Sequence, residues 1–320
     1  MDGVGEPALL IEGSTSPHSF TLKPSHAKLL EEADIIFWVG ESIETFMERP
    51  LESIVKNAEV VEFMEVESIN KLKFREESIF DDHDDHDDHD DHDDHDDHDD
   101  HDDHDDHDDH DDHDDHDDHD DHDDHDDHDD HDDHDDHDDH DDHSGHDHHG
   151  HAHGEFDAHI WLDPMNAKEM VHEIAHELGD LDPANKNKYE ANAQATIQAL
   201  DQLINDIEKG INKDAKFVVF HDAYQYFEER FGVRAAGALT LNTDVLPGAK
   251  QIADIQDVIK DRGIKCIFSE PQFNPKIITT IAKDTNIKTG VFDPLGANID
   301  SNKDLYFKLI QNLGDELKGC

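Results

Sequence analysis

Short apolar runs alternate with helix-forming segments along most of the chain. The apolar runs end at glycine, proline or polar residues, and they predict buried strands at residues 8–11, 35–39, 60–63, 217–220, 265–268 and 290–292. Helices are predicted between them, at residues 24–32, 42–56 with a break at Pro50, 164–178, 223–231, 248–262, 275–284 and 302–317. Strands that alternate with helices indicate an α/β fold with mainly parallel sheets.

The longest predicted helix lies in the middle of this pattern. It is expected to begin at Asp182 and Pro183, an N-cap followed by proline at the first helical position, and to end at Gly210. One apolar stripe recurs at every third or fourth residue: Tyr189, Ala193, Ile197, Leu200, Ile204 and Ile207. About 26 residues span roughly 39 Å, which suits a rigid spacer. We therefore expect two α/β lobes joined by one long helix.

The expected division of the chain follows from this spacer. An N-terminal lobe comprises residues 1–80 and 154–181, the linking helix residues 182–210, and a C-terminal lobe residues 211–320. Between the two parts of the first lobe lies the Asp/His tract, residues 81–153. It consists of the triplet Asp-Asp-His repeated 21 times up to His143, followed by a second histidine-rich stretch.

The Asp/His tract is expected to be disordered. Its triplets have no apolar side chain to bury, so nothing offsets the entropy lost on ordering, and 42 aspartates repel one another. Imidazole and carboxylate are both metal ligands, which predicts loose metal binding along the tract. A solvated linker that grew by repeat expansion is the alternative.

The charge balance narrows the classes of partner. The formal net charge of the 320 residues is −61, and most of it comes from the tract. Such a chain is a poor partner for nucleic acid or an anionic membrane. No stretch of 18 apolar residues predicts a transmembrane helix, and the first residues lack the basic start and apolar core of a signal peptide.

Four residues at strand or loop ends are candidate metal ligands. His18 lies in a loop rich in glycine, serine and proline, His159 borders an apolar run, and His221 and Asp293 each follow a predicted strand directly. Each one alone is more often an ordinary surface or core residue. Because open α/β sheets bind ligands beyond the carboxyl ends of their strands, these residues could meet between the lobes. Three imidazoles and one carboxylate would form a tetrahedral set suited to Zn²⁺.

A second histidine motif competes with this set. The segment His172-Glu173-Ile-Ala-His176 matches H-E-x-x-H, the zinc helix of metalloproteases. However, its polar residues coincide with the polar face of an amphipathic helix, and the longer metzincin pattern does not follow. Other enzyme signatures are absent from the sequence, so a non-enzyme is expected.

Six blocks, in this order, carry a resemblance to a known family: PHSFTLKPS (17–25), ADIIFWVG (33–40), HIWLDP (159–164), FHDAY with a following YF (220–227), SEPQF (269–273) and DPLG (293–296). Together they resemble the zinc-uptake ABC transporter substrate-binding proteins of Gram-negative bacteria. The match spans nearly the whole chain outside the tract. The family's signal peptide and first strand–helix unit precede the region of Ala8 and have no counterpart here, which points to a misplaced start site or a short form.

The resemblance implies one Zn²⁺ in the cleft between the lobes. His18 and His159 would come from the first lobe, and His221 and Asp293, or water in place of the carboxylate, from the second. It also implies a periplasmic protein, expected to be a monomer, that delivers zinc to a membrane permease. Cys266 and Cys320 resemble a disulfide pair of the family, and the tract its histidine-rich loop, a low-affinity metal antenna or sensor. Manganese-binding relatives place a carboxylate where this chain has His221, which favours zinc. The alternatives are a zinc metalloprotease using His172, Glu173 and His176, and a zinc storage or buffer protein.

Overall fold

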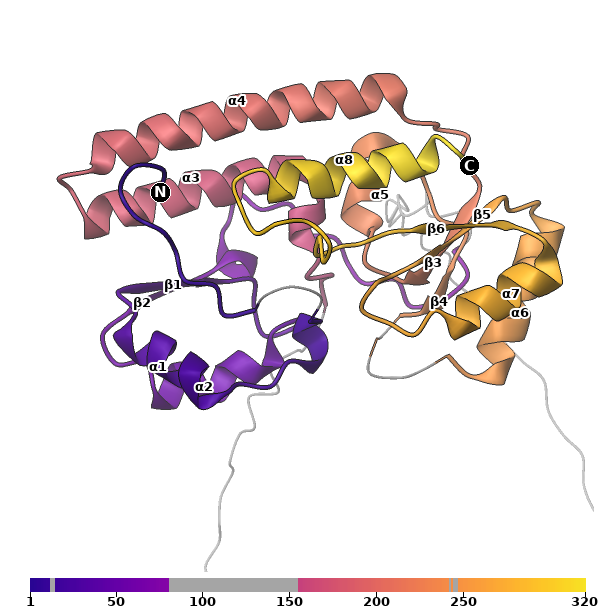
Figure 1. Ribbon diagram of the computed structural model, residues 1–320, viewed down its shortest axis with the longest axis horizontal. Coiled ribbons are helices and arrows are strands. Elements are labelled where there is room, and N and C mark those ends of the chain that lie inside the picture. The colour runs from indigo at the N-terminus through magenta and orange to yellow at the C-terminus, as the bar shows by residue number, and fades with distance from the viewer. Residues whose placement is uncertain (12–14, 81–154, 242, 244–246) are drawn as a thin grey trace, which may run out of the picture. The chain divides into compact units, whose positions relative to one another are not determined.

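The computed structural model describes residues 1–11, 15–80, 155–241, 243 and 247–320 (Figure 1). The Asp/His tract lies outside the described residues, and with it the predictions of disorder and loose metal binding. Among the described elements, strands alternate with helices on both sides of a long helix, as the sequence predicts.

A small parallel sheet forms the core of the N-terminal lobe. Strand β1 (Ile35–Trp38) pairs with β2 (Glu59–Glu62), with Ile35 opposite Glu59. Helices α1 (Pro24–Glu32) and α2 (Glu48–Ser53) flank this sheet. Short 3-10 turns complete the lobe: η1 (Pro17–Ser19), η2 (Thr45–Met47), η3 (Phe63–Glu65) and η4 (Ile160–Leu162). Side chains from the sheet, α1 and η2 form one buried cluster: Leu30, Ile36, Trp38 and Met47.

A four-stranded parallel sheet forms the core of the C-terminal lobe. Its strands are β3 (Phe217–His221), β4 (Ala238–Thr240), β5 (Cys266–Ser269) and β6 (Lys288–Val291), in the order β4-β3-β5-β6. Every residue of β3 is buried, which explains its unbroken apolar run. Helices α5 (Gln225–Phe231), α6 (Ala249–Asp261) and α7 (Lys276–Thr285) complete the lobe. Strand β4 is not predicted from the sequence, because three residues are too short to show a period-2 pattern.

One long helix joins the lobes along one side of the molecule. Helix α4 (Lys186–Gly210) runs beside α3 (Pro164–Leu181) and α8 (Leu305–Leu317) (Figure 1). Its buried stripe consists of Tyr189, Ala193, Ile197, Leu200, Leu203 and Ile207. The predicted fold class, two α/β lobes with mainly parallel sheets joined by a long helix, is confirmed.

Three local predictions are wrong. Helix α4 begins at Lys186 instead of Asp182, because α3 continues to Leu181 and the N–H of Asp182 donates to Leu178 in the last turn of α3. Residues 8–10 and the neighbouring Ile11 form no strand: Leu10 packs against the N-terminal core through its side chain, without a backbone ladder. The predicted helix break at Pro50 is absent, because Pro50 lies in the first turn of α2, where a residue needs no N–H donor.

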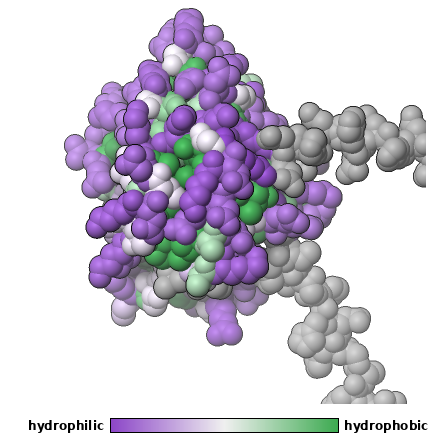
Figure 2. Space-filling model, turned by 90° about the vertical axis from the view of Figure 1, so that its right-hand side faces the viewer, coloured by the Kyte–Doolittle hydropathy of each residue, from purple (hydrophilic) through white to green (hydrophobic). Residues whose placement is uncertain are grey.

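The face of the molecule drawn in Figure 2 is mostly polar. Figure 2 shows hydrophilic residues over most of one face, with hydrophobic residues in small groups between them. No helix in the described part of the chain is long and apolar enough to cross a membrane. The expected disulfide between Cys266 and Cys320 is present and ties the chain end to β5.

Candidate metal centre

Three separate segments each contribute one histidine to the cleft between the lobes. His18 lies in the 3-10 turn η1, which Pro17 opens with its fixed φ. His159 is the residue directly before η4, and His221 is the last residue of the buried strand β3. His159 and His221 are almost completely buried, and His18 is half-buried. The parallel sheet therefore delivers His221 at its carboxyl edge, as expected for a ligand of an open α/β sheet.

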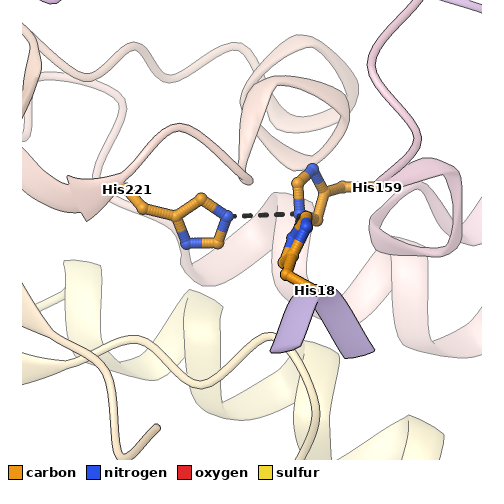
Figure 3. A group of neighbouring side chains, drawn as sticks. All are labelled: His18, His159 and His221. Atoms are coloured by element: carbon orange, nitrogen blue, oxygen red, sulfur yellow. Dashed lines mark hydrogen bonds between the residues drawn. The ribbon is translucent and has the colours of Figure 1, made fainter. Parts of the chain in front are cut away.

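The three imidazoles converge through their Nε2 atoms (Figure 3). Nε2 of His159 lies 3.3 Å from Nε2 of His18 and 3.2 Å from Nε2 of His221. One nitrogen from each ring lies within 4.8 Å of the other two, and no other such group of histidine, cysteine or carboxylate ligands occurs in the described chain. Two nitrogens at ~2.1 Å from a tetrahedral metal are separated by about 3.4 Å. The observed spacing therefore matches that of ligands around one small cation.

Two buried carboxylates orient two of these rings. Oδ1 of Asp157 lies 2.6 Å from Nδ1 of His159, and Oε1 of Glu270 lies 2.8 Å from Nδ1 of His221. An ionised carboxylate can only accept a hydrogen bond, so opposite an ionised carboxylate each Nδ1 carries the proton and donates it. Nε2 of His159 is left with its lone pair directed at the cluster. This is the outer-shell arrangement that fixes the tautomer of metal-binding histidines.

The electrostatics of the three histidines differ. Burial, together with the neighbouring imidazoles, lowers the pKa of His18 to about 3, and burial lowers the pKa of His159 well below its usual range. For His221 burial also opposes the charge, but Glu270 outweighs it and raises the pKa. Burial raises the pKa of Asp157 to about 7. In the absence of a metal, His221 is therefore the ring that best carries a positive charge. Its Nε2–H can then donate to Nε2 of His159.

The structure does not bring Asp293 into this cluster. Its Oδ1 accepts hydrogen bonds from the N–H groups of Leu295 and Gly296 and from Nε2 of Gln272, and its Oδ2 accepts one from the N–H of Ala297. The carboxylate thus stabilises the turn after β6. It lies outside the group of described side chains that converge on one point.

The competing H-E-x-x-H segment lies on helix α3. His172 and His176 are both exposed, and Nδ1 of His176 lies 2.9 Å from Oε1 of Glu177, a neighbour on its own helix. The two rings and Glu173 form no metal-ligand group among the described residues. The motif therefore has the geometry of a solvated helix face.

Sequence reasoning missed the two orienting carboxylates. Glu270 follows β5, so its place at the carboxyl end of a strand is the same signal that pointed to His221. Asp157 precedes His159 by two residues, a spacing with no motif attached to it. Both lie deep in the protein, which an isolated acidic residue in a sequence does not indicate.

Known proteins share extensive sequence similarity with this chain. The family described as zinc-uptake complex component A, periplasmic, matches residues 1–320. A high-affinity zinc uptake system protein of Brucella abortus is 45% identical over 322 residues, covering 100% of this chain and 86% of the relative. The protein of that name from Haemophilus influenzae is 38% identical over 321 residues, covering 100% and 87%.

Solved structures share the fold. A crystal structure of ZnuA aligns with a TM-score of 0.63 at 20% identity, covering 97% of this chain and 89% of the other. A laminin-binding adhesin of Streptococcus agalactiae aligns with a TM-score of 0.62 at 22% identity, covering 96% and 89%. At these identities the two structures support the architecture alone. The match to the family over the full length and the 45% identical relative establish that the chain belongs to the zinc-uptake complex component A family of periplasmic proteins.

Proposed function

We propose that this protein captures Zn²⁺ with high affinity in the cleft between its lobes and delivers it to the membrane permease of an ABC transporter. The observation that carries the proposal is the convergence of three Nε2 atoms at the spacing of metal ligands. The outermost two of these histidines, His18 and His221, are 203 positions apart in the sequence. Neutral imidazole is a preferred ligand of zinc. The relatives named for zinc uptake support the same cargo.

The protein ligands proposed are His18, His159 and His221, with water or Asp293 in the fourth position. The four hydrogen bonds that Asp293 already accepts favour water. Three imidazoles favour zinc over manganese, which prefers carboxylate and water oxygens.

The organisation proposed around this site has two lobes and a connecting helix. Residues 1–80 with 154–181 form the N-terminal lobe, residues 182–210 the link, and residues 211–320 the C-terminal lobe. The disulfide between Cys266 and Cys320 and the family membership support a location in the periplasm, where disulfides persist. The protein acts as a monomer without enzymatic activity, and the Asp/His tract acts as a low-affinity antenna or sensor.

A chelator competition on the full chain tests the cargo and the ligands. A chelator that outcompetes loose sites leaves only tightly bound zinc to be counted, so the tract does not contribute. We expect one tight site in the wild-type protein and in a His176→Ala control, and none in His159→Ala. A tight site that persists in His159→Ala would refute the proposed ligands, and one lost in His176→Ala would support the H-E-x-x-H motif instead.

A further inference from the structure

A nine-residue segment, 72–80, crosses from one ligand-bearing segment to the other. We call these residues the strap. It has no regular secondary structure beyond two isolated antiparallel bridges, at Lys73 and at Ile79. Its last residue, Phe80, is buried. The strap is thus an irregular segment fixed at both of its ends by backbone pairing.

The first half of the strap pairs with the residues that lead to His159. The N–H of Asp157 donates to the carbonyl of Leu72 at 2.8 Å, and the N–H of Phe74 donates to the carbonyl of Glu155 at 3.2 Å. Lys73 faces Phe156 in an antiparallel bridge. Since Asp157 holds the ring of His159, this pairing connects the strap directly to one metal ligand.

The same half also contacts the helix that follows His221. The hydroxyl of Tyr226 accepts from the N–H of Leu72 at 3.0 Å and donates to the carbonyl of Asp157 at 2.6 Å. Nε2 of Gln225 donates to the carbonyl of Lys73 at 2.9 Å. The hydroxyl of Tyr226 therefore joins the strap, the His159 segment and helix α5 at one buried point.

The second half of the strap lies against strand β4. The N–H of Phe80 donates to the carbonyl of Ala236, and the N–H of Ala238 donates to the carbonyl of Ser78. A Cβ at Gly237 would come within 2.6 Å of the Ser78 carbonyl oxygen, so glycine permits this close approach. The strap is thereby attached to the edge of the sheet that carries His221.

Arg75 forms the charged centre of the strap. Its guanidinium donates from Nη1 to Asp222 at 2.9 Å and from Nη2 to Glu228 at 2.6 Å. Both carboxylates are almost fully buried, and the side chain of Arg75 is 15% exposed. Asp222 is the residue directly after His221. The guanidinium also stacks over the ring of Phe80, 4.1 Å from its centroid.

We propose that the strap sets the separation of His159 and His221, and that Arg75 is the positioning residue that holds it in place. The strap forms hydrogen bonds on one side with the backbone of Asp157 and on the other with Asp222 and α5. A shift of the strap would therefore move the segments that carry His159 and His221. Removal of Arg75 leaves two buried carboxylates without their cation, which favours movement of the segment after β3. The inference rests on the zinc site proposed above.

Zinc dissociation from the full chain tests the role of Arg75. The protein is loaded with less than one equivalent of zinc and mixed with excess chelator, and the slow phase reports the tight site. We expect Arg75→Met to dissociate about 10- to 100-fold faster than wild type. Arg75→Lys should fall between them, because an ammonium keeps the charge but cannot bond both carboxylates in the fork geometry of a guanidinium.

Arg230→Met is the matched control for this variant. Arg230 pairs bidentately with Asp163, at 2.6 and 2.7 Å, and so joins the same two segments without contacting the strap. Substoichiometric Co²⁺ adds a spectroscopic measurement, because its visible bands report the geometry of a tetrahedral site. We expect these bands to change in Arg75→Met and to match wild type in Arg230→Met. Equal dissociation rates in the two methionine variants at equal thermal stability would overturn the inference.

Tyr226→Phe tests the strap without disturbing any charge, and it decides the matter if Arg75→Met does not fold. It deletes the hydroxyl shared by Leu72 and Asp157 and leaves the ring in place. Faster zinc dissociation is expected. Tyr189→Phe, which removes a buried tyrosine's hydrogen bond to Asp182 in the turn between α3 and α4, should match wild type. Wild-type rates in both Tyr226→Phe and Arg75→Lys would overturn the strap's role alone. A wild-type protein without a tight zinc site would overturn the proposed function as well.

Discussion

For single residues, the metal centre depends on which nitrogen of each imidazole carries the proton. Asp157 and Glu270 hold a proton on Nδ1 of His159 and His221, so the Nε2 atoms are the ones that face one another. A metal that binds here must displace any proton bound among the three Nε2 atoms. Affinity at this site is therefore a competition between one cation and a proton located on a particular ring.

The three histidines should differ in their response to pH. The pKa of His18 is lowered to about 3, so its ring stays neutral at pH 5 and offers no proton competition there. The pKa of His221 is raised above 6.5, so its ring is charged at pH 6 and zinc must displace that proton. Zinc affinity should thus decline as the pH falls through the pKa of His221. Nitrogen-15 NMR of the zinc-free protein measures the protonation of the two rings as the pH changes. The variants His18→Gln and His221→Gln identify which signal belongs to which ring. A His18 signal that titrates near 6.5 would contradict this.

Asp293 should contribute to the turn after β6 more than to the metal. Its oxygens accept four hydrogen bonds, and asparagine would keep most of them while losing the charge. We expect Asp293→Asn to change the zinc dissociation constant less than about tenfold, which is below the effect of losing a ligand or its outer-shell partner. Chelator competition compares it with His159→Ala. An equal loss in the two variants would place the carboxylate on the metal.

For whole elements, the parallel sheet and its edge decide where the ligands lie. Strand β3 is buried on all sides and ends at His221, while β4 beside it accepts the strap. Helix α4 supplies a continuous buried stripe against α3 and α8. The three histidines therefore lie in short turns and at a strand end, and the regular elements determine their positions.

The contact between β4 and the strap can be loosened by one methyl group. In Gly237→Ala the new Cβ would meet a backbone oxygen at 2.6 Å, which cannot rotate away. We expect a loss of about 1–3 kcal/mol in the free energy of unfolding, and faster amide exchange at Phe80 and Ala238. Hydrogen-exchange mass spectrometry measures the second effect. Gly248→Ala is the control, since its Cβ would meet nothing closer than 3.8 Å, and unchanged exchange at Phe80 in Gly237→Ala would contradict the expectation.

For the whole molecule, one covalent link connects distant parts of the chain. The disulfide between Cys266 and Cys320 closes a loop with a sequence separation of 54 and fixes Cys320, which follows α8, to β5, one of the two inner strands of the sheet. Such a link restricts the unfolded chain more than the folded one.

Loss of this disulfide should destabilise the protein. We expect the double variant Cys266→Ala, Cys320→Ser to lose about 2–5 kcal/mol of unfolding free energy. Urea unfolding of the zinc-free protein measures the loss. A reducing agent should lower the stability of wild type by a similar amount and leave the variant unchanged. A wild-type midpoint that does not respond to reduction would show that the bond has no stabilising role.

The amino-acid sequence determined most of the elements and three of the proposed ligands. Periodicity locates β1, β3, α1 and α8 to within a few residues, because burial on one face or on all sides leaves a direct trace in residue type. Positions at strand or loop ends marked His18, His159 and His221 as candidates, and the blocks shared with a family pointed to the same histidines and to the disulfide. Sequence reasoning failed where a choice depended on neighbours: α3 used Asp182 as its terminus, and residues 8–11 found no strand to pair with.

Only the tertiary structure decided how the three rings meet and what holds them. Asp157 and Glu270 became ring-orienting groups because folding buried them beside Nδ1 atoms, and Asp293 became a turn-stabilising group because four donors surround it. Arg75 gained its partners from segments about 150 residues further along the chain. A sequence records which side chains can bind a proton or a metal, whereas distances between remote segments arise only once the backbone has folded.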